Sequence, residues 1–175
     1  MHTLSYRAPE YVAALLRFDL EVEFDAKILD IGCGTGLVGK ELTSLHYVNV
    51  HGVDIAPKMI LLAQAKNCYR SCRLIEDLRC VRDTYDVVIM CSVFGRGHVS
   101  LESAGLVPDL IRDGARIIIA QLSPETDLEN KELQNFAEAI ATRLKAQAPR
   151  VEPIERYISE RSGILAIVSV GTHNR

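Results

Sequence analysis

The sequence predicts an α/β fold: a doubly wound, mostly parallel seven-stranded sheet that includes an antiparallel C-terminal hairpin strand. Short apolar runs alternate with segments of helical periodicity, which is typical of helices that cover a parallel sheet. A glycine-rich turn joins the first apolar run to the segment after it, as at the ligand-binding edge of such sheets. The last two runs, 151–158 and 164–170, are joined by too short a link for a parallel crossover, so we expect them to pair antiparallel.

The individual elements follow from apolar periodicity and from turn residues. Pro9 and Pro57 are each expected in the first turn of a helix, and Thr126 with Glu129 forms a capping box before a long helix. We expect strands at 27–31, 49–54, 73–75, 85–90, 116–120, 151–158 and 164–170. We expect the other helices at 37–44 and 101–112. The helix from Pro57 is expected to bury a stripe made of Met59, Ile60, Leu61, Leu62 and Ala65.

Length and composition suit a single domain over residues 1–175. The chain is 48% apolar and 25% charged, an ordinary globular balance that can build a core unaided. Its formal net charge of −3 gives no support for a nucleic-acid surface, where a basic stripe would be expected. No apolar run is long enough to predict a membrane span. The five cysteines include no C-x-x-C pair, which favours reduced thiols in the cytoplasm over disulfides or a metal site.

The segment from Ile28 to Gly36 carries the main functional signal. An apolar strand ends in a carboxylate, Asp30, and glycines follow at positions 32, 34 and 36. Glycine allows the sharp turn from strand to helix and leaves room for a ligand to approach the backbone. Asp54, which lies 18 residues after Gly36, is expected to end the second strand and to accept hydrogen bonds from ribose hydroxyls. Together these residues predict a pocket for a nucleoside-containing cofactor.

Two cofactors fit the glycine spacing. Residues 34–39 match G-x-G-x-x-G, the pattern of NAD-binding turns, although a lone match of this kind is weak. Asp30 argues against NAD, because its negative charge would lie where a pyrophosphate is held near a helix N-terminus. S-adenosylmethionine (SAM) has no phosphate and carries a sulfonium and an ammonium, so a carboxylate favours it. The remaining alternative is a structural turn flanked by two aspartates that bind nothing.

Four segments resemble motifs of the class I SAM-dependent methyltransferases, which have a Rossmann-like fold. They are 30–36, 53–59, 85–88 and 112–117, with Asp113 where that family has proline. The resemblance covers about Ile28 to Ala120. Segments 6–9, 36–38, 51–54 and 97–99 further resemble the Williams–Beuren methyltransferase-like subfamily. Its members carry an upstream segment that helps to cover the cofactor, so we expect an N-terminal lid here to be short or missing.

The resemblance implies a role for each matching residue. Asp30, Gly32 and Gly34 would line the methionine end of the cofactor, and Asp54 would take the ribose. Cys33 and Gly36 belong to the same turn and complete that part of the expected cofactor site. The residues expected near the adenine are Ile55 and Met59, with Glu76 or Asp77 by its amino group. Cys91 and Ser92, which follow the fourth strand, would touch the cofactor through backbone atoms.

The expected activity is transfer of a methyl group from SAM to a small-molecule or protein acceptor, which leaves S-adenosylhomocysteine (SAH). Such a displacement needs positioning and no covalent nucleophile. The motifs of amino-group and cytosine methylation are absent after the fourth strand, so nucleic-acid acceptors are not expected. His98 is a candidate base; the alternative is a loop histidine that caps a turn or the next helix. Tyr6 and Phe94 belong either to the acceptor site or to the packing of the core or a lid. The alternative functions are a non-catalytic SAM-binding module, acting as a sensor or interaction partner, and an NAD-dependent oxidoreductase.

Overall fold

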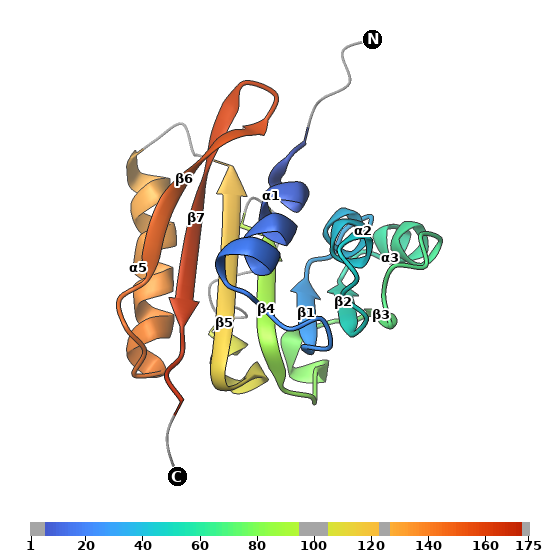
Figure 1. Cartoon of the computed structure of the whole chain (residues 1–175), viewed down its shortest axis with the longest axis horizontal. Coiled ribbons are helices and arrows are strands. Elements are labelled where there is room, and N and C mark those ends of the chain that lie inside the picture. Colours follow the sequence, from blue (N-terminus) through green and yellow to red (C-terminus); the bar gives the residue numbers. More distant parts are fainter. Residues whose placement is uncertain (1–5, 95–104, 123–126, 173–175) are drawn as a thin grey trace.

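The computed structural model describes residues 6–94, 105–122 and 127–172, with backbone alone for 127–132. One seven-stranded sheet has the order β3-β2-β1-β4-β5-β7-β6 (Figure 1). Neighbours from β3 to β5 pair in parallel, whereas β7 is antiparallel to both β5 and β6. The predicted α/β fold with an antiparallel C-terminal hairpin is therefore confirmed. The strands are β1 (Ile28–Ile31), β2 (Val50–Asp54), β3 (Ser71–Leu74), β4 (Tyr85–Cys91), β5 (Ile111–Leu122), β6 (Arg150–Ile158) and β7 (Arg161–Ser169).

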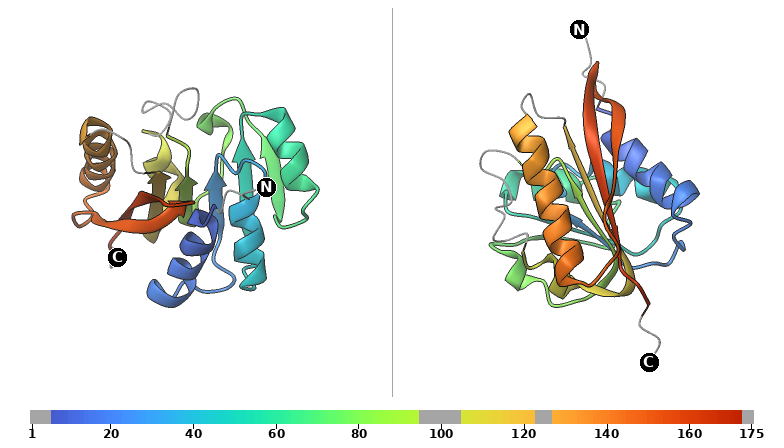
Figure 2. Two further views of the ribbon diagram at one scale, coloured as in Figure 1. Left: turned by 90° about the horizontal axis from the view of Figure 1, so that it is seen from above. Right: turned by 90° about the vertical axis from the view of Figure 1, so that its left-hand side faces the viewer.

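Helices cover both faces of the sheet (Figure 2). One face carries α1 (Ala8–Ala14), which continues as a π-helical turn over Leu15–Asp19, and α2 (Leu37–Ser44). The opposite face carries α5 (Asp127–Arg143). A further helix, α3 (Pro57–Gln64), lies against β2 and β3 at the edge of the sheet. The core is accordingly divided into two main apolar clusters, one on each side of the central strands β1, β4 and β5.

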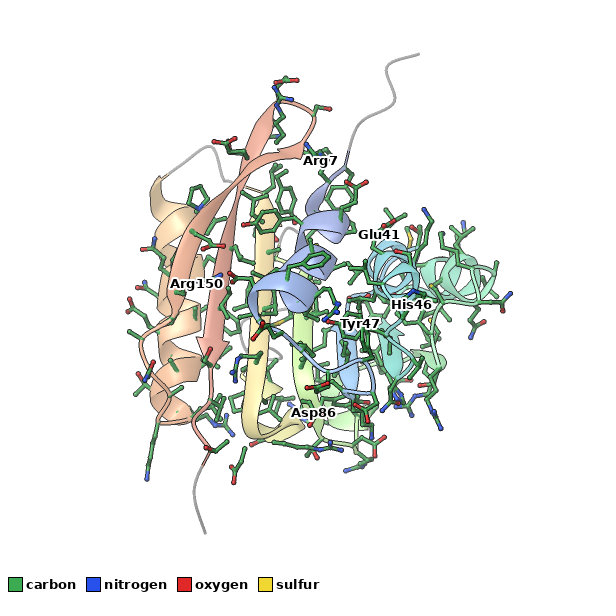
Figure 3. The ribbon with its side chains drawn as sticks, viewed as in Figure 1. Arg7, Glu41, His46, Tyr47, Asp86 and Arg150 are labelled. Carbon is green, nitrogen blue, oxygen red and sulfur yellow. The ribbon has the colours of Figure 1, made fainter. Side chains whose placement is uncertain are left out.

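The register of the central strands sets the position of the functional residues. Ile31 pairs with Val53 on one side and with Met90 on the other. Asp54 and Cys91 therefore end their strands side by side with the glycine-rich turn, at the carboxyl edge of the sheet. Asp86 lies at the opposite edge, far from Arg7 (Figure 3), where it accepts a hydrogen bond from the Lys27 backbone N–H at 2.8 Å.

Two expectations about helices are wrong. We expected a helix over 101–112, but the described residues of this segment do not form one. They form a 3-10 turn at Val107–Leu110, which leads into β5 at Ile111. Pro108 lacks the N–H that a longer helix would need there, and Gly114, with φ of +79°, lies within β5 instead of ending a helix. In α3 only Ile60 and Ala63 are buried, whereas Met59, Leu61, Leu62 and Ala65 are exposed. This helix covers only the β2–β3 edge, so the face that it buries is narrow.

Among the described residues, no helix combines the length and the apolar character that crossing a bilayer would require.

Candidate functional site

A cavity of about 490 Å³ opens at the carboxyl edge of the sheet. This volume suits a small organic ligand or cofactor. The glycine-rich turn, the end of β2 with the start of α3, and the residues that follow β3 and β4 form its wall. The lining residues are Tyr6, Pro9, Asp30 to Thr35, Leu37, Val38, Val53 to Ala56, Met59, Ile75 to Leu78 and Cys91 to Val93.

Asp54 holds the backbone around the cavity. Its Oδ2 accepts a hydrogen bond from the Gly34 N–H at 2.8 Å, and its Oδ1 accepts one from the Ala56 N–H at 2.8 Å. Gly32 and Gly34 have φ values of +66° and +52°, and a Cβ on Gly32 would lie 2.5 Å from Val93 Cγ1. A carboxylate offers about four acceptor positions, so Asp54 keeps the capacity to accept hydrogen bonds from a ligand.

Asp30 is a buried carboxyl with an unusual pKa. It is 1% exposed, and its Oδ2 accepts a hydrogen bond from the Tyr69 hydroxyl at 2.6 Å. Burial raises the pKa of Asp30 to about 7; the nearby charge of Asp54 acts in the same direction, and the Tyr69 hydrogen bond opposes both. Near neutral pH the group is therefore partly protonated, and a cation beside it would favour its charged form.

Tyr69 is a structural partner of the site that sequence analysis missed. Besides donating to Asp30, its hydroxyl accepts the Gly39 N–H at 3.2 Å. Its ring fills the space left by three glycines, because a Cβ on Gly39 would overlap it and a Cβ on Gly36 or Gly52 would lie within 3.2 Å of it. Tyr69 comes from the loop between α3 and β3, so nothing in the glycine spacing pointed to it.

The structure brings eleven of the expected site residues into the cavity wall: Asp30, Gly32, Cys33, Gly34, Asp54, Ile55, Met59, Glu76, Asp77, Cys91 and Ser92. It places Gly36 elsewhere. With φ of +85°, Gly36 starts α2 and packs against Ala63 and Tyr69, so the need for glycine there is structural. Phe94 packs on Phe136 with ring centroids 5.0 Å apart and is outside the lining, whereas Tyr6 is part of it. His98 lies outside the described residues.

The charge of the cavity wall selects among ligands. It contains four acidic side chains, Asp30, Asp54, Glu76 and Asp77, and the described lining residues include no Lys, Arg or His. A pyrophosphate would find no cationic partner among them, whereas a ligand with a positive centre would be stabilised. The wall can therefore hold a nucleoside that carries a cation more readily than a dinucleotide.

Comparisons with known proteins agree with this geometry. Residues 28–106 match the family model described as "Methyltransferase domain". The chain is 32% identical over 137 residues to human methyltransferase-like protein 27, an alignment that covers 74% of this chain and 55% of the relative. It is 40% identical over 73 residues to malonyl-[acyl-carrier protein] O-methyltransferase of Bacillus cereus, covering 39% of this chain and 27% of that protein.

A solved structure shows the same fold. Magnesium protoporphyrin IX methyltransferase of Synechocystis PCC 6803, determined with bound SAH, superposes with a TM-score of 0.71. The match covers 95% of this chain and 83% of that one at 19% sequence identity. The chain thus spans about half, or less, of the length of the curated relatives, and nearly all of it has the fold of a solved methyltransferase.

Proposed function

We propose that this chain, which belongs to the class I SAM-dependent methyltransferases, binds SAM in the described cavity and transfers its methyl group to a small-molecule or protein acceptor. The observation that carries the proposal is the cavity wall itself. Asp54 and the glycine-rich turn line the cavity together at the end of β2, and the wall holds four acids with no cation among its described residues. This chemistry favours a nucleoside with a positive centre over NAD.

The lining residues have distinct roles under this proposal. Asp54 accepts hydrogen bonds from the ribose hydroxyls, and Ile55 and Met59, both partly exposed, pack against the adenine. Glu76 or Asp77 accepts a hydrogen bond from the adenine amino group. Asp30 lies toward the methionine end with the backbone of the glycine-rich turn, including Cys33. Cys91 and Ser92 bound the end of the cavity that lies next to β4.

Bound SAM supplies an activated methyl group on a sulfonium leaving group. The protein then has to bind, orient and exclude water, because displacement at the methyl carbon needs alignment more than it needs a protein nucleophile. The buried strand ends and the fixed turn supply rigid supports for that alignment. Residues that lie outside the described ranges, His98 among them, are not required by these steps.

The compared proteins support both acceptor classes. By their names, the Bacillus cereus relative acts on a malonyl group carried by a protein, and the Synechocystis enzyme acts on a magnesium porphyrin. We also propose a cytoplasmic location, which is supported by five cysteines that form no disulfide. We expect no nucleic-acid acceptor, since the sequence has a net charge of −3.

The test is transfer of label from methyl-labelled SAM to pools of small molecules and of proteins, with the Asp54→Ala variant as control. We expect a labelled product that the wild-type chain forms much faster than the variant does when SAM is limiting. If SAM binds but every pool stays unlabelled, the chain is a non-catalytic SAM-binding module. If no SAM binds at all, the cofactor assignment is wrong.

A further inference from the structure

Four polar side chains meet at the end of the cavity next to β4. Tyr6 precedes α1, Cys91 ends β4 and Ser92 follows it, and Tyr157 belongs to β6. Tyr6, Cys91 and Ser92 line the cavity, whereas Tyr157 is 1% exposed and lies behind them. We call these four residues the hydroxyl cluster.

The hydrogen bonds of the hydroxyl cluster run in one direction. The Tyr157 hydroxyl donates its hydrogen to the Ala120 carbonyl at 3.0 Å. Because it has no second hydrogen, it must accept from the Ser92 hydroxyl, 2.5 Å away. Ser92 in turn accepts from the Tyr6 hydroxyl at 2.9 Å. The hydrogen of Tyr6 is thus committed to Ser92. Its oxygen can accept from the Cys91 thiol, whose sulfur is 3.3 Å away, and keeps one further lone pair for a ligand.

The hydroxyl cluster is uncharged at neutral pH. Burial raises the pKa of both Tyr6 and Tyr157 well above the usual value for tyrosine. Burial likewise raises the pKa of the Cys91 thiol, to about 11. The Tyr6 oxygen therefore acts through its lone pairs and not as a phenolate, so a positive centre nearby would be attracted without a countercharge.

Several contacts fix Tyr6 in this place. The Arg7 N–H donates to the Tyr157 carbonyl at 3.0 Å, and Tyr6 pairs with Ile158 in an isolated β-bridge. The rings of Tyr6 and Tyr157 meet edge to face, with centroids 5.7 Å apart. Ser92 has φ of +59°, a rare conformation for a serine, and it is held there by its N–H, which donates to the Ala120 carbonyl at 2.8 Å.

We propose that Tyr6 is a positioning residue for the positively charged end of the cofactor, and that Ser92 and Tyr157 orient its hydroxyl. This inference rests on the proposed function. The adenine lies by the residues that follow β2 and β3, and Asp54 takes the ribose. The sulfonium, which is bonded to the ribose C5′, then lies on the side toward β4, where the Tyr6 oxygen keeps a lone pair. Weak C–H···O contacts with groups on a positive sulfur would favour SAM over SAH, which has no such charge.

The test compares the affinities for SAM and SAH, measured by calorimetry, in Tyr6→Phe. Tyr11→Phe is the matched control, because Tyr11 lies in α1 and outside the cavity lining, and its hydroxyl bonds only the half-buried Glu152 among the residues described. We expect Tyr6→Phe to weaken SAM binding roughly two- to fivefold with little change for SAH, and Tyr11→Phe to leave both unchanged. An unaltered ratio of the two affinities in Tyr6→Phe would overturn the proposal.

A second variant and the binding of the wild-type chain make the result interpretable. If Tyr6→Phe does not fold, Tyr157→Phe is the deciding variant. It leaves the Ser92 hydroxyl hydrogen without its acceptor, so the direction of the hydrogen bonds from Tyr6 to Tyr157 is no longer fixed. The Ala120 carbonyl still accepts the Ser92 N–H. The SAM-to-SAH preference should fall in that variant, and an unchanged preference would count against the proposal. If the wild-type chain binds neither ligand, the proposed function fails together with this inference; if it binds both and only the preference is insensitive, this inference fails alone.

Discussion

The two ends of the cavity are built in opposite ways. At one end, Asp54 and the glycines of a single turn lie within 30 residues of one another, and backbone conformation defines the site. At the other end, the hydroxyl cluster joins Tyr6 to Ser92, 86 residues away in sequence, and Ser92 to Tyr157, a further 65 residues away. The first end can be encoded in a short motif, whereas the second exists only after the sheet has assembled.

The two ends also differ in charge. Asp30 and Asp54 put carboxyl groups beside the glycine-rich turn, and the pKa of Asp30 lies at about 7, so its charge changes near neutral pH. The hydroxyl cluster stays neutral there, because burial raises the pKa of its tyrosines and its thiol. The turn end should therefore respond to pH and to the charge of a ligand, and the hydroxyl end should respond to hydrogen-bond geometry.

The largest effect is expected at the glycine-rich end, from Gly39→Ala. In an isolated helix this change would stabilise, because alanine favours helix more than glycine does. Here the new Cβ would overlap the Tyr69 ring, so we expect the free energy of unfolding to fall by about 2–3 kcal/mol. Urea unfolding, followed by circular dichroism, measures this free energy in the variant and in the wild type.

Gly171→Ala is the matched control, since a Cβ at that position meets nothing within 4 Å. It should cost no stability. A gain in stability for Gly39→Ala would show that Tyr69 does not occupy the space beside the glycine-rich turn, and the structural explanation of that glycine would be lost.

Asp54→Ala should lower SAM affinity by about 2 kcal/mol, or roughly 30-fold, because ribose hydrogen bonds and the support of the Gly34 and Ala56 N–H groups are removed together. Asp86→Ala is the control at the opposite edge of the sheet. It also removes a carboxylate that accepts a backbone N–H, that of Lys27, so it should lose stability and keep SAM affinity. Equal affinity losses in both variants would mean that Asp54 acts only through folding.

The titration of Asp30 predicts a smaller effect, about tenfold or 1.4 kcal/mol. A cationic ligand favours the ionised carboxylate, so SAM affinity should fall about tenfold from pH 8 to pH 6, across the pKa of about 7. In the unliganded chain the same raised pKa contributes folding stability at pH below 3.8, which is lost as the pH rises through about 7. Asp30→Asn should flatten the binding profile; a flat profile in the wild type would show that no positive group of the ligand lies beside Asp30.

The smallest effect is expected at the hydroxyl end, from Tyr157→Phe. The Ala120 carbonyl keeps the Ser92 N–H at 2.8 Å, so no buried carbonyl is left without a partner. Loss of the two hydroxyl hydrogen bonds should lower the free energy of unfolding by about 1 kcal/mol. If Tyr157→Phe lowered the free energy of unfolding as much as Gly39→Ala does, the hydroxyl cluster would be a main support of the fold. The two ends of the cavity would then not differ in the way described.

The same division explains what sequence could predict. The alternation of strands and helices, the glycine-rich turn and Asp54 rest on local patterns, and the structure places the turn and Asp54 in one cavity wall. Tyr69 was missed because its role depends on the space left by Gly36, Gly39 and Gly52, which are brought together by packing. The exposed face of α3 was misjudged because apolar residues around a whole helix do not reveal how narrow a sheet edge it covers. Tyr157 carried no sequence signal, since its partners come from other strands.

The measurement that tests the central claim most directly is a calorimetric titration of the wild-type chain with SAM, SAH and NAD in parallel. An acidic cavity with no described cation in its wall predicts that SAM and SAH each bind at one site and that NAD does not bind. Binding of NAD in preference to SAM, or of none of the three, would contradict the assignment of this cavity to SAM.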